Sequence, residues 1–197
     1  MIMFMTLDGV AEFPIYPGTE PSSDDLSEDP MWIRRMPEID TIVLGRNSYE
    51  KWARHWPAQL RNPNAAPFEK AFAAFSDDVK KVVFSKTLKS ADWRNTVIVR
   101  GDPTDEVHKL QAVPGKNIAL GGGPRLAQSF IERGLVDEML LEVFPSVLGK
   151  GKPLFNVKPD PDSPEDFIPV GTPGRRDFKL LEAKALNDGT VFLHLIR

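Results

Sequence analysis

Short apolar runs along the chain alternate with longer segments in which apolar residues recur at helical spacing. Five runs in the first two thirds end at polar residues or glycine, as buried strands do: 2–6, 41–44, 81–84, 96–99 and 118–120. Three further runs follow with no helical pattern between them: 139–144, 178–185 and 191–196. Asn187-Asp188-Gly189, between the last two, is a hairpin turn signal. We therefore predict a mixed, mainly parallel sheet that ends in an antiparallel C-terminal hairpin.

Segments between these runs have the pattern of amphipathic helices. Phe68, Ala71, Phe72 and Phe75 stand at i, i+3, i+4 and i+7 and give one segment an apolar face. Further helices are expected from Asp102-Pro103 to Pro114-Gly115, from Pro124 to Gly134 and, less regularly because of Pro30, between Ser23 and Met36. Two stretches, 18–24 and 159–174, have loop composition. Helices that alternate with strands predict an α/β fold with helices flanking the sheet.

Composition limits the classes of function. A chain of 197 residues with 41% apolar residues is expected to form a single domain, residues 1–197. Its formal charge of −3 and the absence of a long basic run argue against nucleic acid as a partner. There is no cysteine, so we expect a cytoplasmic protein without disulfides. The apolar start at residues 1–5 is too short for a signal peptide, and no run is long enough to span a membrane.

A glycine turn marks the first candidate site. Gly121-Gly122-Gly123 follows an apolar run and precedes the helix that starts at Pro124. Glycine allows the backbone to approach an anion closely, and the start of a helix presents unpaired N–H groups and a positive dipole end. A tight turn without a ligand explains three glycines equally well.

A second turn, Gly45-Arg46-Asn47-Ser48, also joins an apolar run to a helical segment. Arg46 in the first turn is unfavourable against the helix dipole, which favours a bound anion, or else a salt bridge to a nearby carboxylate. The next run ends in Ser85-Lys86, a hydroxyl and a cation. Three strand ends with such groups predict one ligand with several phosphates in the crevice beyond the strands.

The order of these motifs resembles the dihydrofolate-reductase-like superfamily, in the branch that contains the reductase domain of riboflavin biosynthesis. The resemblance covers nearly the whole chain and rests on the following segments: Thr6-Leu7-Asp8-Gly9, residues 44–50, residues 83–88, Gly121-Gly122-Gly123, residues 134–138 and residues 145–155. It implies a three-layer α/β fold, a mixed sheet between helices, and hydride transfer from NADPH to a small heterocyclic substrate. Related proteins are commonly homodimers, so we expect a homodimer.

Carried onto this chain, the resemblance implies a cofactor site. The pyrophosphate would lie near Gly45, Asn47, Ser48 and Gly121–Gly123, and the 2′-phosphate of the adenosine near Arg46, Ser85 and Lys86. Cations and a hydroxyl suit a dianionic phosphate, whereas sites for NAD more often show an acidic residue. Arg125 is a further candidate, although Pro124 occupies the position where related reductases usually have the basic residue.

Fewer residues of the sequence point to a substrate site than to the cofactor site. The resemblance places Thr6 to Ala11 between nicotinamide and substrate, with Asp8 either as a site residue that orients the substrate or positions the loop, or as an ordinary turn residue. Trp32 would stack on a planar substrate or belong to the core. The acid that dihydrofolate reductases carry on the first helix has four possible counterparts here: Asp24, Asp25, Glu28 and Asp29.

Three functions remain open at this point. The nearest is a 5-amino-6-(5-phosphoribosylamino)uracil reductase of the riboflavin type, whose usual deaminase domain has no counterpart in these 197 residues. The second is a dihydrofolate reductase, and the third is a non-catalytic NADP(H)-binding protein. We expect no metal site, because the three histidines are scattered and none has a second ligand at i+2 to i+4.

Overall fold

The computed structural model describes residues 1–11, 31–155 and 176–197. Its strands are β1 (Ile2–Thr6), β2 (Ile39–Gly45), β3 (Lys80–Phe84), β4 (Thr96–Val99), β5 (Asn117–Leu120), β6 (Glu138–Phe144), β7 (Lys179–Ala185) and β8 (Val191–Ile196). Its helices are α1 (Met31–Arg35), a 3-10 turn at Met36–Glu38, α2 (Arg46–Gln59), α3 (Pro67–Asp78), α4 (Pro103–Gln111) and α5 (Pro124–Glu132). Every predicted strand is present within two residues of its expected bounds.

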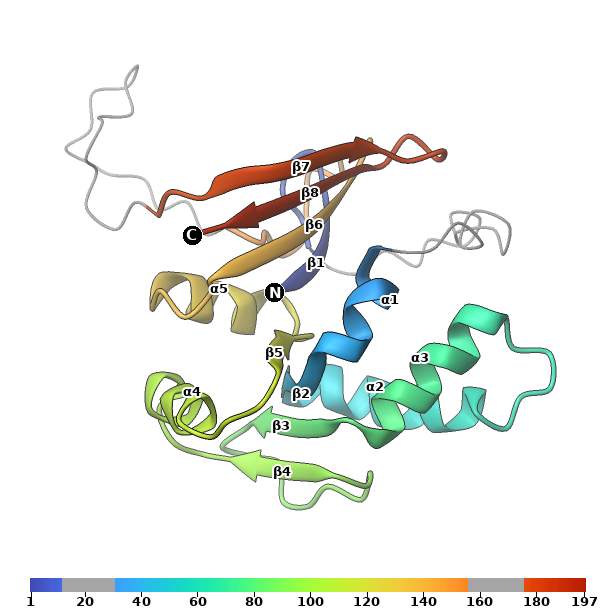
Figure 1. Cartoon of the computed structure of the whole chain (residues 1–197), viewed down its shortest axis with the longest axis vertical. Coiled ribbons are helices and arrows are strands. Elements are labelled where there is room, and N and C mark those ends of the chain that lie inside the picture. Colours follow the sequence, from blue (N-terminus) through green and yellow to red (C-terminus); the bar gives the residue numbers. More distant parts are fainter. Residues whose placement is uncertain (12–30, 156–175) are drawn as a thin grey trace.

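The strands form two hydrogen-bonded sheets of four strands each, in the orders β4-β3-β2-β5 and β1-β6-β8-β7. The first is entirely parallel, while in the second β1 and β6 are parallel and β8 is antiparallel to both β6 and β7. The prediction of a mixed α/β fold with an antiparallel C-terminal hairpin is therefore confirmed. Figure 1 shows the two sheets in the upper and lower halves of the molecule. The division into two sheets could not be predicted from apolar periodicity, because periodicity shows where a strand lies but not which strand it pairs with.

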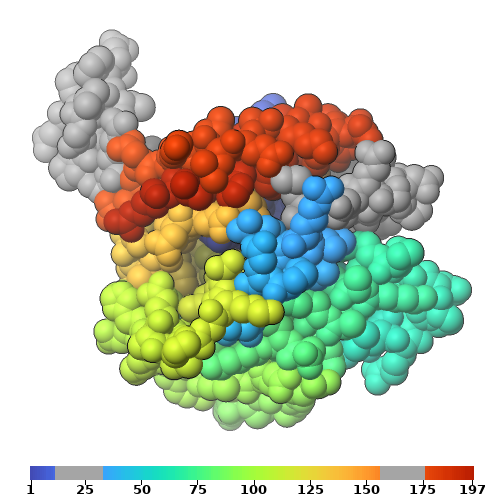
Figure 2. Space-filling model, in the orientation of Figure 1, coloured from blue at the N-terminus to red at the C-terminus, as the bar shows by residue number. Residues whose placement is uncertain are grey.

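A shared core joins the two halves. One cluster of buried side chains contains Val43 and Val82 of the lower sheet, Met3 and Leu141 of the upper sheet, and Phe130 of α5. Burying apolar side chains from both sheets in one cluster stabilises the halves against separation. Figure 2 shows α1 seated between the two halves on the face in view.

Helices cover both faces of the lower sheet. Alternate residues of β2 point to opposite sides, so that Val43 belongs to the cluster with α5, while Ile42 and Leu44 belong to a second cluster with α2 and α3. In that second layer the Phe72 ring lies edge-on to two tryptophans, with centroid distances of 5.4 Å to Trp52 and 4.5 Å to Trp56. The three-layer arrangement follows from a strand that is buried on both faces.

Some expectations fall outside the described residues. Of the helix expected between Ser23 and Met36, the structure describes only α1 and the turn that follows it. The stretches 18–24 and 159–174 lie outside the described residues, as do the acid candidates Asp24, Asp25, Glu28 and Asp29. Trp32 lies in α1, but its side chain is outside the described part of the chain.

Candidate cofactor and active site

The two glycine turns lie side by side. Strands β2 and β5 are parallel neighbours, with Val43 opposite Leu120, so the turns that follow them emerge at the same edge of the sheet. A Cβ atom added to Gly122 would lie 3.6 Å from the backbone nitrogen of Gly45, and one added to Gly123 would lie 3.6 Å from Ser48 Oγ. The structure therefore brings together two turns that are separated by more than seventy positions in the sequence.

Each turn ends at the start of a helix. Gly45 is the N-cap of α2 and Gly123 the N-cap of α5, and neither terminus has a side-chain capping hydrogen bond. The first N–H groups of a helix need acceptors from outside the helix, and the helix dipole makes this end positive. Two adjacent, uncapped helix starts form a position suited to an anion.

Packing explains only some of the glycines. A Cβ on Gly121 would lie 3.0 Å from Trp52 Cη2, and one on Gly122 would lie 2.9 Å from Leu126 Cδ2, so a side chain at either position would force its neighbour to shift. At Gly45 and Gly123 the nearest atoms would be 3.9 Å and 3.6 Å away, which is ordinary contact. The tight-turn explanation thus accounts for Gly121 and Gly122, while Gly45 and Gly123 leave space at the surface between the helix starts.

Basic side chains gather beside these turns. Arg46 forms an ion pair with Glu50 (Nε–Oε1 2.8 Å), and its Nη1 donates to Thr87 Oγ1 at 3.0 Å. Of the two explanations for Arg46 in the first turn of the helix, the salt bridge to a nearby carboxylate is therefore present. Because the Arg46 side chain is 47% exposed, it stays within reach of a ligand.

The turn after β3 presents further polar groups. The Ser85 hydroxyl accepts hydrogen bonds from the backbone nitrogens of Thr87 (3.2 Å) and Leu88 (2.9 Å), which fixes the turn, and Lys86 is exposed. Arg100 reaches the same turn from the end of β4, where its guanidinium donates to the carbonyls of Ser85 (3.1 Å) and Leu88 (2.8 Å). Arg46 and Arg100 thus contact residues 85–88, and Lys86 belongs to that turn; we call these three side chains and this turn the basic cluster.

Sequence reasoning missed Thr87 and Arg100. The signal for Arg100 was available, because it directly follows an apolar run in the way that Ser85-Lys86 follows another. The contribution of Thr87 depends on the fold, which brings its hydroxyl to Arg46. The remaining cofactor candidates, Asn47 and Arg125, are exposed at the first turns of α2 and α5.

Asp8 connects two loops. Its Oδ1 accepts a short hydrogen bond from the buried Thr6 hydroxyl, and its Oδ2 accepts from the backbone nitrogens of Leu148 (3.1 Å) and Gly149 (2.7 Å). These hydrogen bonds, the one from Thr6 above all, lower the pKa of Asp8 below its usual value. Asp8 is therefore an ionised anchor that positions the loop, and an ionised carboxylate has no proton to donate.

Backbone pairing strengthens the same connection. Leu7 N donates to Ser146 O at 2.9 Å, and Ala11 N donates to Lys152 O at 2.9 Å. Gly9 and Gly149 have positive φ angles of 75° and 67°, which a side chain would disfavour. Residues 6–11 and 145–154, two of the segments that carry the resemblance, thus form one unit; we call it the paired loops.

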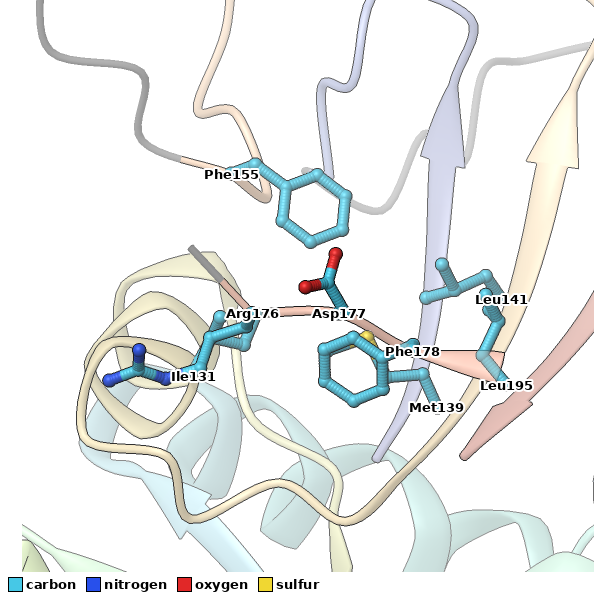
Figure 3. Close-up of a pocket in the computed structure, with 8 residues that line it drawn as sticks. All are labelled: Ile131, Met139, Leu141, Phe155, Arg176, Asp177, Phe178 and Leu195. Carbon is cyan, nitrogen blue, oxygen red and sulfur yellow. The ribbon is translucent and has the colours of Figure 1, made fainter. Parts of the chain in front are cut away.

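A cavity of about 440 Å³ lies beside the end of α5. Figure 3 shows that apolar side chains line it, with the Asp177 carboxylate between Phe155 and Phe178 and the Arg176 guanidinium pointing away from them. None of its lining residues belongs to the glycine turns or the paired loops. Within residues 1–11, 31–155 and 176–197, no group of three or more acidic or histidine side chains is placed to hold a metal ion. None of the described helices has the length and apolar character needed to cross a bilayer.

The chain is similar to known proteins over most of its length. Residues 1–192 match the family model described as the RibD C-terminal domain. Two uncharacterized proteins of Bacillus subtilis are similar over 118 residues: YyaP with 41% identity and YwjB with 27%. These alignments cover 60% of this chain and 60% and 59% of the two relatives, so the chain spans less than two thirds of their length.

Solved structures show the same fold. A putative riboflavin biosynthesis protein from Shewanella sp. PV-4 has a TM-score of 0.61 at 17% identity, covering 100% of this chain and 96% of its own. RibD of Acinetobacter baumannii has a TM-score of 0.62 at 18% identity, covering 99% of this chain and 56% of its own. A pyrimidine reductase-like protein from Corynebacterium diphtheriae has a TM-score of 0.58 at 16% identity, with 99% and 89% coverage.

Proposed function

Because the chain belongs to the RibD C-terminal domain family, we propose that it is an NADPH-dependent reductase of a small nitrogen heterocycle of the pyrimidine type. The observation that carries the proposal is the pair of adjacent, uncapped helix starts at Gly45 and Gly123, next to the basic cluster. One site for a pyrophosphate and, beside the same start of α2, one for an additional phosphate would correspond to the two charged parts of NADPH.

The residues present fit that cofactor. A side chain at Gly123 would meet the Ser48 hydroxyl at 3.6 Å and one at Gly45 would meet the Leu126 side chain at 3.9 Å, so glycine at both positions leaves room for the backbone to contact pyrophosphate oxygens closely. Arg46, Lys86 and Arg100 supply three positive charges around the 85–88 turn, which suits a dianionic 2′-phosphate. Sites for NAD more often carry an acidic residue, and Glu50, the carboxylate beside Arg46, is already paired with that arginine.

When bound, NADPH would supply a hydride to an electron-poor carbon of the substrate. The protein's own part is orientation and exclusion of water. The paired loops, held by Asp8, would border the nicotinamide and the substrate, as the resemblance implies for Thr6 to Ala11. Arg125 and Asn47 would contact the cofactor from the first turns of their helices.

Spectroscopy tests the proposal. The full chain is mixed with NADPH and, separately, 5-amino-6-(5-phosphoribosylamino)uracil or dihydrofolate, and the absorbance of the reduced nicotinamide is followed. We expect oxidation with the pyrimidine. Oxidation with dihydrofolate alone would favour a dihydrofolate reductase, binding of NADPH without oxidation would favour a non-catalytic binding protein, and no binding at all would reject the proposal.

A further inference from the structure

Glu142, on strand β6 of the upper sheet, is a half-buried carboxyl group that has no role in the cofactor site or the paired loops described above. Glu142 is on β6, opposite Phe4 of β1 and Phe192 of β8, so these three side chains lie on one face of the sheet. The ring of Phe144, two residues further along the strand, lies 6.4 Å from that of Phe4. The carboxyl group of Glu142 thus stands among aromatic side chains.

Its position relates it to the paired loops. Strand β6 ends at Phe144 and leads into residues 145–154, and β1 ends at Thr6, opposite Phe144, and leads into residues 6–11. Glu142 therefore stands two residue pairs before Thr6 and Phe144, where both loops leave the sheet. Ligands in α/β proteins bind beyond the carboxyl ends of the parallel strands, and β1 and β6 are the parallel pair of this sheet.

Glu142 also lacks partners. Within the described part of the chain its carboxyl group makes no hydrogen bond or ion pair, although the residue is half-buried. Glu138, four residues earlier on the same face, differs sharply: its Oε1 lies 2.6 Å from Arg35 Nη2 and 2.6 Å from His194 Nε2. A carboxylate that is taken out of water without a partner is unfavourable. The ionised form of Glu142 therefore destabilises the protein unless the carboxylate binds a proton or a ligand.

A second carboxylate adds to this effect. Asp188, in the β7–β8 turn, is held by Thr190, whose N donates to Oδ1 at 2.8 Å and whose hydroxyl donates to Oδ2 at 2.9 Å. Burial and, secondarily, repulsion by Asp188 raise the pKa of Glu142 to about 7. The other charged or titratable groups on this face are His194 of β8, Glu182 and Lys184 of β7, and Arg35 of α1, which reaches Glu138. None of them forms a described ion pair with Glu142.

We propose that Glu142 is the proton donor of the proposed reduction and acts on a C=N or C=O group of the substrate held over β1 and β6. This assignment rests on the proposed reductase function. The O–H bond of the Glu142 carboxyl breaks, and an N–H or O–H bond forms on the heteroatom of the double bond. The neighbouring carbon receives the hydride, so that NADPH becomes NADP⁺ and the substrate gains a hydride and a proton, which together are two electrons and two protons. Water then returns a proton to the Glu142 carboxylate.

The test compares Glu142→Gln with the unmodified chain. Glutamine has the same shape but no acidic proton, so we expect hydride transfer from NADPH to 5-amino-6-(5-phosphoribosylamino)uracil to slow by about 100-fold, while NADPH affinity stays unchanged. The rate of the unmodified chain should fall as pH rises above about 7, and this fall should be absent in the variant. Glu182→Gln removes a carboxylate from the exposed neighbouring strand β7 and should change neither quantity.

A readout independent of turnover accompanies the kinetics. Carbon-13 NMR of labelled glutamate side chains should show one carboxyl that titrates near neutral pH and disappears in Glu142→Gln. Asp188→Asn removes the repelling charge and should move that titration to lower pH, together with the pH profile of the rate.

The outcomes separate the two proposals. If the unmodified chain oxidises NADPH and Glu142→Gln does so at the same rate with the same pH profile, the donor assignment is wrong and the reductase proposal stands. A Glu142 that titrates like an ordinary glutamate also overturns the assignment. If the unmodified chain oxidises NADPH with neither substrate, the reductase proposal fails and the donor assignment fails with it.

Discussion

At the residue scale, the four glycines of the two turns divide into two kinds. Gly121 and Gly122 are required by their neighbours, whereas Gly45 and Gly123 have room for a methyl group and have backbone angles open to any residue (φ −85° and −73°). We therefore assign a role in folding to Gly121 and Gly122, and a role in binding to Gly45 and Gly123.

The first prediction uses that difference. Gly123→Ala and Gly45→Ala should change the free energy of unfolding by less than about 1 kcal/mol, because alanine fits both conformations. Each should weaken NADPH binding by about tenfold, or about 1.4 kcal/mol, because the methyl group would stand where the backbone meets the phosphate. Fluorescence titration with NADPH and thermal unfolding measure the two effects.

Gly121→Ala is the matched control for folding. Its methyl group would lie 3.0 Å from Trp52 and 3.3 Å from Ile42, so we expect a loss of about 1–3 kcal/mol of stability. Full NADPH affinity in Gly123→Ala and Gly45→Ala would show that no phosphate lies between the helix starts.

The second prediction concerns the choice between NADPH and NADH. Arg46→Ala and Arg100→Ala should each weaken NADPH binding by about tenfold, since a charge-assisted hydrogen bond contributes about 1.5–3 kcal/mol, and should leave NADH binding nearly unchanged. Stability should change little in Arg46→Ala, because exposed ion pairs one helical turn apart contribute only about 0.3–0.5 kcal/mol.

Arg54→Ala is the control for this pair. Arg54 lies on the same helix α2, and its guanidinium donates to the Glu50 carbonyl at 3.1 Å, away from the 85–88 turn. Equal affinities of the unmodified chain for NADPH and NADH would contradict the assignment of the basic cluster to a 2′-phosphate.

At the element scale, the Asp8 carboxylate adds to the backbone hydrogen bonds that join the paired loops. The Asp8 pKa is lowered by the hydrogen bonds it accepts, so its contribution to stability is complete above the ordinary value of 3.8 and is lost as pH falls below it. Asp8→Ala removes the acceptor for the amides of Leu148 and Gly149 at every pH. We predict faster hydrogen exchange at these two amides, with the amides of α3 unchanged as an internal control. Unchanged exchange at Leu148 and Gly149 would mean that the backbone pairing holds the loops without Asp8.

Most elements could be predicted from the sequence, because buried strands and amphipathic helices leave periodic patterns. The contacts that a buried side chain makes could not be predicted, as Lys81 shows. Lys81 lies in a run predicted as a buried strand, and the structure does bury it completely: its Nζ donates to the carbonyls of Ser76, Asp77 and Val79 at the end of α3, and it lies 4.3 Å from the Trp93 ring centroid. Burial lowers the Lys81 pKa to about 8. A sequence pattern shows the strand, but these partners exist only in the folded chain.

Some residues of the candidate site could be predicted from the sequence and others could not. Gly45 to Ser48, Ser85-Lys86 and the three glycines carry local signals, since each follows a strand and two of the turns begin a helix. Glu142 has no such signal, because one glutamate in an apolar strand can face water. Its neighbours Phe4, Phe192 and Asp188 come from distant parts of the sequence, and only strand pairing brings them together.

At the scale of the whole molecule, strand β7 stands at the end of the upper sheet. Among the described residues it pairs only with β8, and Leu180, Leu181 and Val191 are exposed by 52%, 48% and 38%. Exposed edges and apolar patches favour association. We predict a homodimer, with twice the chain mass of 22.0 kDa by light scattering. Leu180→Glu should shift the mass towards that of the monomer, while Lys184→Glu, which introduces a charge of the same sign on the same strand without removing an apolar side chain, should not. A monomeric unmodified chain would refute the prediction.

The division into two sheets has a mechanical consequence. In the described residues no backbone ladder joins β5 to β1, so side chains alone resist sliding of one half against the other. Side-chain contacts yield to small displacements more readily than a row of directional hydrogen bonds does. A dinucleotide held by the glycine turns of the lower half and by the paired loops of the upper half would act as a brace across this boundary. Its arrival would then stiffen the molecule as a whole.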